Sequence, residues 1–165
     1  MKRRILTTSE PADDKLLRTR ATAIPDGEIG TTNVQRIVQD MKDTLADTQL
    51  GIAIAAPQIG ESKRIFVVSP RAFAEGADFL VCINPQLTKL SRDKSDLEEA
   101  CLSIPGIAGT VRRSNKVTLR AFDEKGNAYT SFFVSSEIVK WNVKTLEILD
   151  RVPTYYSIGH LCVPG

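Results

Sequence analysis

A change in the spacing of apolar residues near residue 50 constrains the fold of this chain more than any other feature. Before this point, apolar side chains recur at helical spacing, at Val34, Ile37, Val38, Met41 and Leu45. The pattern starts with Thr32-x-x-Gln35, which is typical of a capping box at a helix N-terminus. The sequence therefore predicts a first helix over about residues 33–50.

Beyond residue 60, the apolar residues fall instead into short runs rich in β-branched and aromatic side chains, at 64–69, 79–83, 117–122 and 129–134. Such runs predict strands. The segment 123–126 between the last two runs ends in Gly126, which can adopt a positive φ, and it predicts a hairpin turn. One helix followed by these strands indicates the α+β class.

A second helical pattern follows the last strand. Ser135 or Ser136 is suited to cap it, and its apolar positions are Ile138, Val139, Trp141, Val143, Leu146 and Leu149. Asn142 and Thr145 interrupt the apolar face, which is typical of a helix that lines a pocket. We therefore predict a late helix, and we expect residues 1–165 to form a single domain.

The charge and composition limit the partners that this chain can have. The net charge is +2, with 42% hydrophobic and 25% charged residues, which are ordinary values for a globular protein. Such a balance gives no field that would attract nucleic acid or an anionic membrane. No apolar run approaches the ~18 residues of a membrane span. We expect a cytoplasmic protein without a nucleic-acid or membrane partner, whose three cysteines are reduced.

Two segments carry the most chemical information. The first is GIAIAAPQIG at residues 51–60, where small side chains allow another backbone to approach closely and Gln58 offers hydrogen-bond donors and an acceptor. The second is EACLSIPG at residues 99–106, which contains Cys101. Taken singly, each has a structural explanation: a tightly packed helix-to-strand connection for the first, and a buried small apolar side chain for the second.

Together and in this order, the two segments resemble those of the peptide deformylases, which carry GxGxAAPQ, then EGCxS, then a helix with Gln-His-Glu-apolar-Asp-His-Leu. The segments SKRIFVV at 62–68 and VRRSNKVTLRAFDEKGN at 111–127 are also similar to that family, so the resemblance extends over about residues 5–133. It implies a peptide-deformylase-like α+β fold with one N-terminal helix and mostly antiparallel strands packed around a late central helix.

The resemblance also implies a chemistry. In that family, a divalent metal (Fe, Zn, Ni or Co) held by a cysteine and two histidines activates a water that attacks the formyl group of an N-terminal formyl-methionine. Carried over to this sequence, Cys101 corresponds to the thiolate ligand, and Gln58 and the Leu102 N–H correspond to the oxyanion donors. The substrate-binding residues that it implies are Gly51, Ile52, Ala53 and Ala100.

The third motif departs from the family pattern. Aligned without a gap, residues 140–146 place Trp141 and Thr145 at the two histidine positions and Asn142 at the position of the glutamate. Cys101 is then the sole retained ligand position, whereas such metal sites need three or four protein ligands. Asn142 cannot accept a proton as a general base does. This alignment predicts a catalytically inactive homologue that binds no cofactor and retains a cleft for an N-terminal (formyl)methionyl peptide.

Two alternatives stay open. The first is an active, metal-dependent peptide deformylase with non-standard ligands, in which Cys101, His160 and Cys162 hold the metal. The second is a purely structural role, such as a partner subunit for an active paralogue. The cleft itself also departs from the family, because Ala53 and Ala100 replace glycines, and the added methyl groups would crowd an extended peptide.

Overall fold

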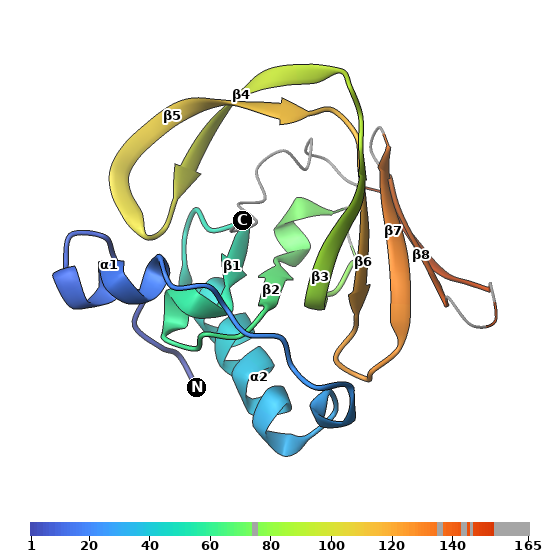
Figure 1. Ribbon diagram of the computed structural model, residues 1–165, viewed down its shortest axis with the longest axis horizontal. Coiled ribbons are helices and arrows are strands. Elements are labelled where there is room, and N and C mark those ends of the chain that lie inside the picture. The colour runs from blue at the N-terminus through green and yellow to red at the C-terminus, as the bar shows by residue number, and fades with distance from the viewer. Residues whose placement is uncertain (74–75, 135–136, 143–144, 146, 154–165) are drawn as a thin grey trace.

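The structure is a computed structural model that describes residues 1–165 except 74–75, 135–136, 143–144, 146 and 154–165 (Figure 1). For residues 129–134, 137–142 and 149–153, only the backbone is described. In the parts of the chain that are described, no helix has both the length and the apolar character needed to cross a membrane.

Two α-helices precede the sheets, α1 (Pro11–Leu17) and α2 (Thr32–Asp47). The helix predicted over 33–50 is confirmed as α2, but it ends at Asp47 because Thr48 already has an extended backbone. Thr31, not Thr32, is the N-cap residue, and no side-chain hydrogen bond caps this end, so the predicted capping box is wrong. The expectation of one N-terminal helix missed α1, a short helix that begins at Pro11.

Among the described residues, nine strands form two antiparallel sheets. The larger sheet has the order β1-β2-β3-β6-β7-β8-β9, and β4 and β5 form a separate two-stranded hairpin that arches over β1 in Figure 1. The bounds are β1 (Ala53–Ala55), β2 (Ile65–Val68), β3 (Leu80–Leu90), β4 (Lys94–Cys101), β5 (Ile104–Ser114), β6 (Val117–Phe122), β7 (Ala128–Val134), β8 (Glu137–Asn142) and β9 (Ile148–Pro153). Three short 3₁₀ turns complete the elements, η1 (Asp26–Glu28), η2 (Ala56–Ile59) and η3 (Pro70–Ala72).

The four predicted strands are confirmed as β2, β3, β6 and β7. The predicted turn at 123–126 is also confirmed, since it joins β6 to β7, the Gly126 N–H donates to the Asp123 carbonyl, and Gly126 has a φ of 81°. The sequence did not predict the β4–β5 hairpin. Together with the two helices, these sheets confirm the α+β class.

The predicted late helix is wrong for the residues that are described there. Residues 137–142 form β8, which pairs with β7, and residues 148–153 form β9, which pairs with β8. The physical reason is that Ile138, Val139 and Trp141 are β-branched or aromatic residues, which favour strands, and β7 presents an adjacent edge for them to pair with. The sheet therefore continues where a central helix was expected.

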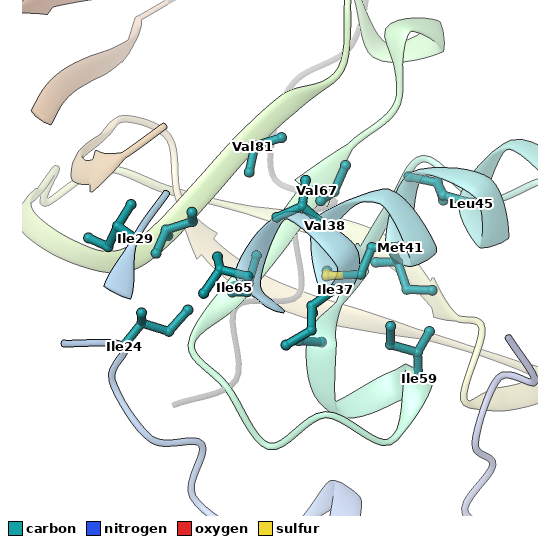
Figure 2. Packing of buried hydrophobic residues seen from close by; sticks show 14 residues of the cluster. Ile24, Ile29, Ile37, Val38, Met41, Leu45, Ile59, Ile65, Val67 and Val81 are labelled. Atoms are coloured by element: carbon teal, nitrogen blue, oxygen red, sulfur yellow. The ribbon is translucent and has the colours of Figure 1, made fainter. Parts of the chain in front are cut away.

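The core lies between α2 and one face of the sheet. The buried side chains of α2 recur at helical spacing and pack against alternate residues of β2 and β3 (Figure 2): Ile37, Val38, Met41 and Leu45 from α2, with Ile65, Val67, Val81 and Ile83 from the sheet. A second cluster includes the intervening residues Phe66, Val68 and Cys82 on the opposite face. Because β2 and residues 81–83 of β3 are buried on both faces, β2 gives the adjacent β1 a rigid support.

Candidate functional site

A cavity of about 1000 Å³ lies between the two motif segments. One wall comes from residues 49–55 and Gln58, and another from residues 98–102 and 104–108. Apolar side chains of the sheet and of η3 also line the cavity, namely Phe66, Val68, Ala72, Phe73 and Leu80. In the part of the chain that the structure describes, β1 pairs only with β2 and β4 pairs only with β5. Two strands that each have an unpartnered edge therefore line the cavity.

The side-chain amide of Gln58 connects the two walls. Its Oε1 accepts a hydrogen bond from the Ala55 N–H at 2.8 Å, which fixes the orientation of the amide. Its Nε2 then faces the second motif, where it lies 3.1 Å from Ser103 Oγ and 3.8 Å from Cys101 Sγ. The structure thus brings together Gln58 and Cys101, which the sequence singled out from two separate segments.

The N-terminal segment around Leu6 and Thr8 forms main-chain hydrogen bonds with both motif segments. The Leu6 N–H donates to the Gln58 carbonyl at 2.8 Å, and the Thr8 N–H donates to the carbonyl of Ser103 at 2.9 Å. Ser103 is buried, so its carbonyl and its hydroxyl both need these partners. Gln58 and Ser103 are therefore fixed relative to one another by a third stretch of backbone.

Asp13 in α1 anchors this N-terminal segment. Its carboxylate accepts two hydrogen bonds from the Arg4 guanidinium, at 2.6 and 2.9 Å, and one from the Thr7 N–H at 3.1 Å. The pKa of the Asp13 carboxyl lies below its ordinary value, chiefly because the Arg4 hydrogen bonds favour the ionised form and despite the opposing effect of burial. Ionised Asp13 therefore stabilises the segment that carries Leu6 and Thr8.

Gly51 occupies a position where a side chain has no room. A Cβ built there would lie 2.2 Å from Thr48 Oγ1, 2.9 Å from Leu45 Cδ1 and 3.1 Å from Leu102 Cδ1. The Gly51 N–H also donates to Thr48 Oγ1 at 3.1 Å. Close packing at Gly51 thus joins the end of α2 to Leu102, the residue that follows Cys101.

The other residues expected to bind substrate also line the cavity. Ile52 and Ala53 are half-buried, with Ala53 opposite Val68 in the β1–β2 pair. Ala100 is exposed on β4, opposite Ala108. All the expected substrate-binding and oxyanion residues therefore lie around one cavity, while their roles stay predictions.

The structure does not place Trp141, Asn142 and Thr145 on one helix. Trp141 and Asn142 belong to β8, which is separated from β1 by β2, β3, β6 and β7 in the sheet order, and their side chains lie outside the described part of the structure. Thr145 is an exposed turn residue whose Oγ1 donates to Glu147 Oε2 at 3.1 Å. His160 and Cys162, the alternative ligands, also lie outside the described residues.

Sequence reasoning missed an ion pair beside the site, between buried Glu99 and half-buried Arg113. Arg113 Nε and Nη2 donate to the two carboxylate oxygens of Glu99, both at 2.8 Å, and Glu99 lines the cavity. The two residues belong to β5 and β4, so only the unpredicted hairpin brings them together. Ser103 lies within the quoted EACLSIPG motif, but the motif gave no indication that its hydroxyl would accept a hydrogen bond from Gln58.

The described residues supply part of a metal site. Cys101 is half-buried in the cavity wall, and a thiolate there suits zinc or iron. Within the ranges that the structure describes, no three His, Cys, Asp or Glu side chains are grouped closely enough to hold a metal ion. Cys101 therefore fits the role of one metal ligand.

Comparisons with known proteins place this site in a family context. The family model for polypeptide deformylases matches residues 3–133. Peptide deformylase 2 of Clostridium acetobutylicum is 35% identical over 119 residues, which are 72% of this chain and 73% of that protein. Peptide deformylase 1 of Clostridium perfringens is 37% identical over 117 residues, 71% of this chain and 74% of that protein.

Solved structures show the same fold. A peptide deformylase from Legionella pneumophila, 30% identical, has a TM-score of 0.69 and covers 90% of this chain and 77% of its own. The Met-Ala-Ser-bound class I type b peptide deformylase from Acinetobacter baumannii, at 24% identity, has a TM-score of 0.70 and covers 81% of this chain and 84% of its own.

These matches correct one expectation drawn from the sequence. The expectation that the protein needs no cofactor is contradicted, because peptide deformylases are metal-dependent enzymes and both the family model and the curated relatives assign the chain to them. The matches likewise give no support to a loss of the metal site or of activity.

The packing around Gly51 generates a test of stability. Gly51→Ala should lower the free energy of unfolding by ~1–3 kcal/mol, because the added methyl group overlaps Thr48 and Leu45. Gly109→Ala is the matched control, since a Cβ at Gly109 meets nothing within 4 Å, and it should change stability by less than ~0.5 kcal/mol. Urea unfolding measures both. Equal stability of the two variants would refute the tight packing at Gly51.

The Asp13 anchor generates a test by pH. Because the pKa of Asp13 is lowered in the folded state, its contribution to stability is complete above the ordinary carboxyl pKa of about 4 and is lost as the pH falls through the lowered folded-state pKa. In Asp13→Asn and Arg4→Gln, the free energy of unfolding should therefore fall less steeply below about pH 4 than in the parent protein. Parallel curves for all three proteins would contradict this anchor.

Proposed function

The chain belongs to the polypeptide deformylase family, and we propose that it is itself a metal-dependent peptide deformylase that removes the formyl group from an N-terminal formyl-methionine. The observation that carries this proposal is the placement of the Gln58 amide 3.8 Å from Cys101 Sγ in the wall of the cavity. This arrangement combines a hydrogen-bond donor for the substrate with a thiolate ligand for the metal.

The cavity suits an extended peptide. A strand edge can pair with an incoming peptide through main-chain hydrogen bonds, and both β1 and β4 have an edge without a strand partner in the described residues. Phe66, Val68 and Phe73 provide an apolar lining for a methionine side chain. The volume of about 1000 Å³ is at the upper end of the roughly 300–1,000 Å³ usual for ligand pockets. The Met-Ala-Ser complex of the Acinetobacter relative is consistent with this use of the fold.

Gln58 and Leu102 provide the electrostatic part of the proposed reaction. Because Gln58 Oε1 is held by the Ala55 N–H, its Nε2 presents one hydrogen to Ser103 and the other toward Cys101, where the formyl oxygen would lie. The Leu102 N–H supplies a second donor to the same oxygen as negative charge develops on it. Fixed donors of this kind each contribute roughly 10²–10³ to kcat.

Cys101 supplies the sulfur ligand of the proposed metal site, and His160 and Cys162, which lie outside the described residues, stay the sequence candidates for the other ligands. When bound, the metal lowers the pKa of a water molecule from about 15.7 toward about 7, so that hydroxide is available at neutral pH. The apolar walls of the cavity exclude bulk water from the formyl group, which strengthens the hydrogen bonds that Gln58 and Leu102 donate.

Formate release from formyl-Met-Ala-Ser tests this function, with protein prepared without a His-tag and loaded with Fe²⁺, Zn²⁺, Ni²⁺ or Co²⁺. We expect activity that a chelator abolishes and that the metal restores. Gln58→Ala should lower kcat by roughly 10²–10³. Gln86→Ala is the matched control, because Gln86 is an exposed glutamine of β3 outside the cavity lining, and it should leave kcat unchanged.

Two results would contradict the proposal. Absence of formate release with all four metals, in a folded protein that still binds Met-Ala-Ser, would instead support a peptide-binding homologue without catalysis. Full activity of Cys101→Ala would show that the reaction does not use this site.

A further inference from the structure

Arg71 connects η3 to the C-terminal end of α2. Its Nη1 donates to the carbonyls of Thr48 at 2.6 Å and Gln49 at 3.3 Å, and its Nη2 donates to the carbonyl of Ala46 at 3.1 Å. One guanidinium therefore binds three main-chain carbonyls at the end of α2 and in the segment that follows it. The Ala46 carbonyl belongs to the last turn of α2, where a helix leaves its carbonyls without partners inside the helix, and the other two belong to the segment that follows.

The end of α2 depends on this distant arginine for its charge. A helix C-terminus carries a partial negative charge that a cation stabilises, but the last turn of α2 contains no basic residue. Arg71 supplies that cation from a segment more than twenty residues further along the chain. The planar fork of a guanidinium suits several carbonyls at once, which a lysine ammonium on a flexible stem does not match.

The turn that Arg71 holds leads directly into the edge of the cavity. Gly51 packs against Thr48 and Leu102, as described above, so the position of the turn determines where both walls meet. The segment around Arg71 also holds the next residue, since the Ser69 N–H donates to the carbonyl of Ile52 at 2.8 Å. The Arg71 guanidinium therefore fixes the backbone just before Gly51, at residues 46–49, and the Ser69 N–H fixes it just after, at Ile52.

We propose that Arg71 is a positioning residue that fixes the 51–53 edge of the cleft and thereby sets its affinity for peptide. This inference rests on the proposed peptide substrate. Arg71 itself lines the cavity, and it acts through the backbone of residues 46–52 without entering the reaction. Its loss should therefore affect binding of the peptide more than the chemical step. A KM effect with little change in kcat distinguishes this role from a catalytic one.

The experiment compares Arg71→Gln and Arg71→Lys with Arg92→Gln, a matched control because Arg92 is exposed and lies outside the cavity lining. In Arg71→Gln, we expect KM for formyl-Met-Ala-Ser to rise about tenfold with kcat within about twofold of the parent value. Amide hydrogen exchange over residues 48–53 should be about tenfold faster. Arg71→Lys should fall between the parent and Arg71→Gln, and Arg92→Gln should match the parent.

Each outcome decides between the proposals. Unchanged exchange over 48–53 in Arg71→Gln would overturn the positioning role, and so would faster exchange with unchanged KM. If the parent protein neither cleaves formyl-Met-Ala-Ser nor binds Met-Ala-Ser, the proposed function is overturned, and hydrogen exchange alone then decides whether Arg71 fixes this edge. A kcat that falls with KM unchanged would also contradict the assignment, because it would indicate a role in the chemical step.

Discussion

The site depends above all on the hydrogen bonds made by one amide side chain, that of Gln58. Its Oε1 accepts from the Ala55 N–H of β1, and its Nε2 faces Ser103 and Cys101 on the opposite wall, while the main-chain carbonyl of the same residue accepts from the Leu6 N–H. An amide that is only partly exposed costs free energy wherever one of its groups lacks a partner. Gln58 thus bonds to β1, to the segment of Cys101 and Ser103, and to the N-terminal segment. These hydrogen bonds fix the spacing between the cavity walls.

The parts of the fold that the sequence predicted are those whose apolar pattern reflects burial. α2 presents one buried face, and β2 and residues 81–83 of β3 are buried on both, so their apolar pattern was visible in the sequence. β4 and β5 form a two-stranded hairpin whose residues are mostly exposed, and neither the polar β4 nor the β5 segment with its Gly and Pro residues gave a strand pattern. The contacts of Ser103 and Arg113 depend on that hairpin, and the contacts of Arg71 depend on the turn after α2, so residue types alone could not predict them.

The prediction of an inactive protein had two grounds. One was that His160 is the single histidine of the sequence. The other placed residues 140–146 on the metal-binding helix of the family, so that Trp141 and Thr145 replaced the histidines. In the structure, Trp141 pairs with Thr130 of β7 and Thr145 lies in a turn, so these residues do not form that helix. The ungapped alignment of the third motif therefore has no structural support. The ligands that accompany Cys101 have to be identified by experiment and not by that alignment.

The proposed function requires that Cys101 in this cleft holds a catalytic metal. Cobalt titration can detect this bond, because a cysteine thiolate bound to Co²⁺ gives a charge-transfer absorption that oxygen and nitrogen ligands do not give. We expect an absorption that saturates at one equivalent of Co²⁺ in the parent protein, is displaced by Zn²⁺ and is absent from Cys101→Ala. No such absorption in the parent protein, or an unchanged absorption in Cys101→Ala, would contradict it.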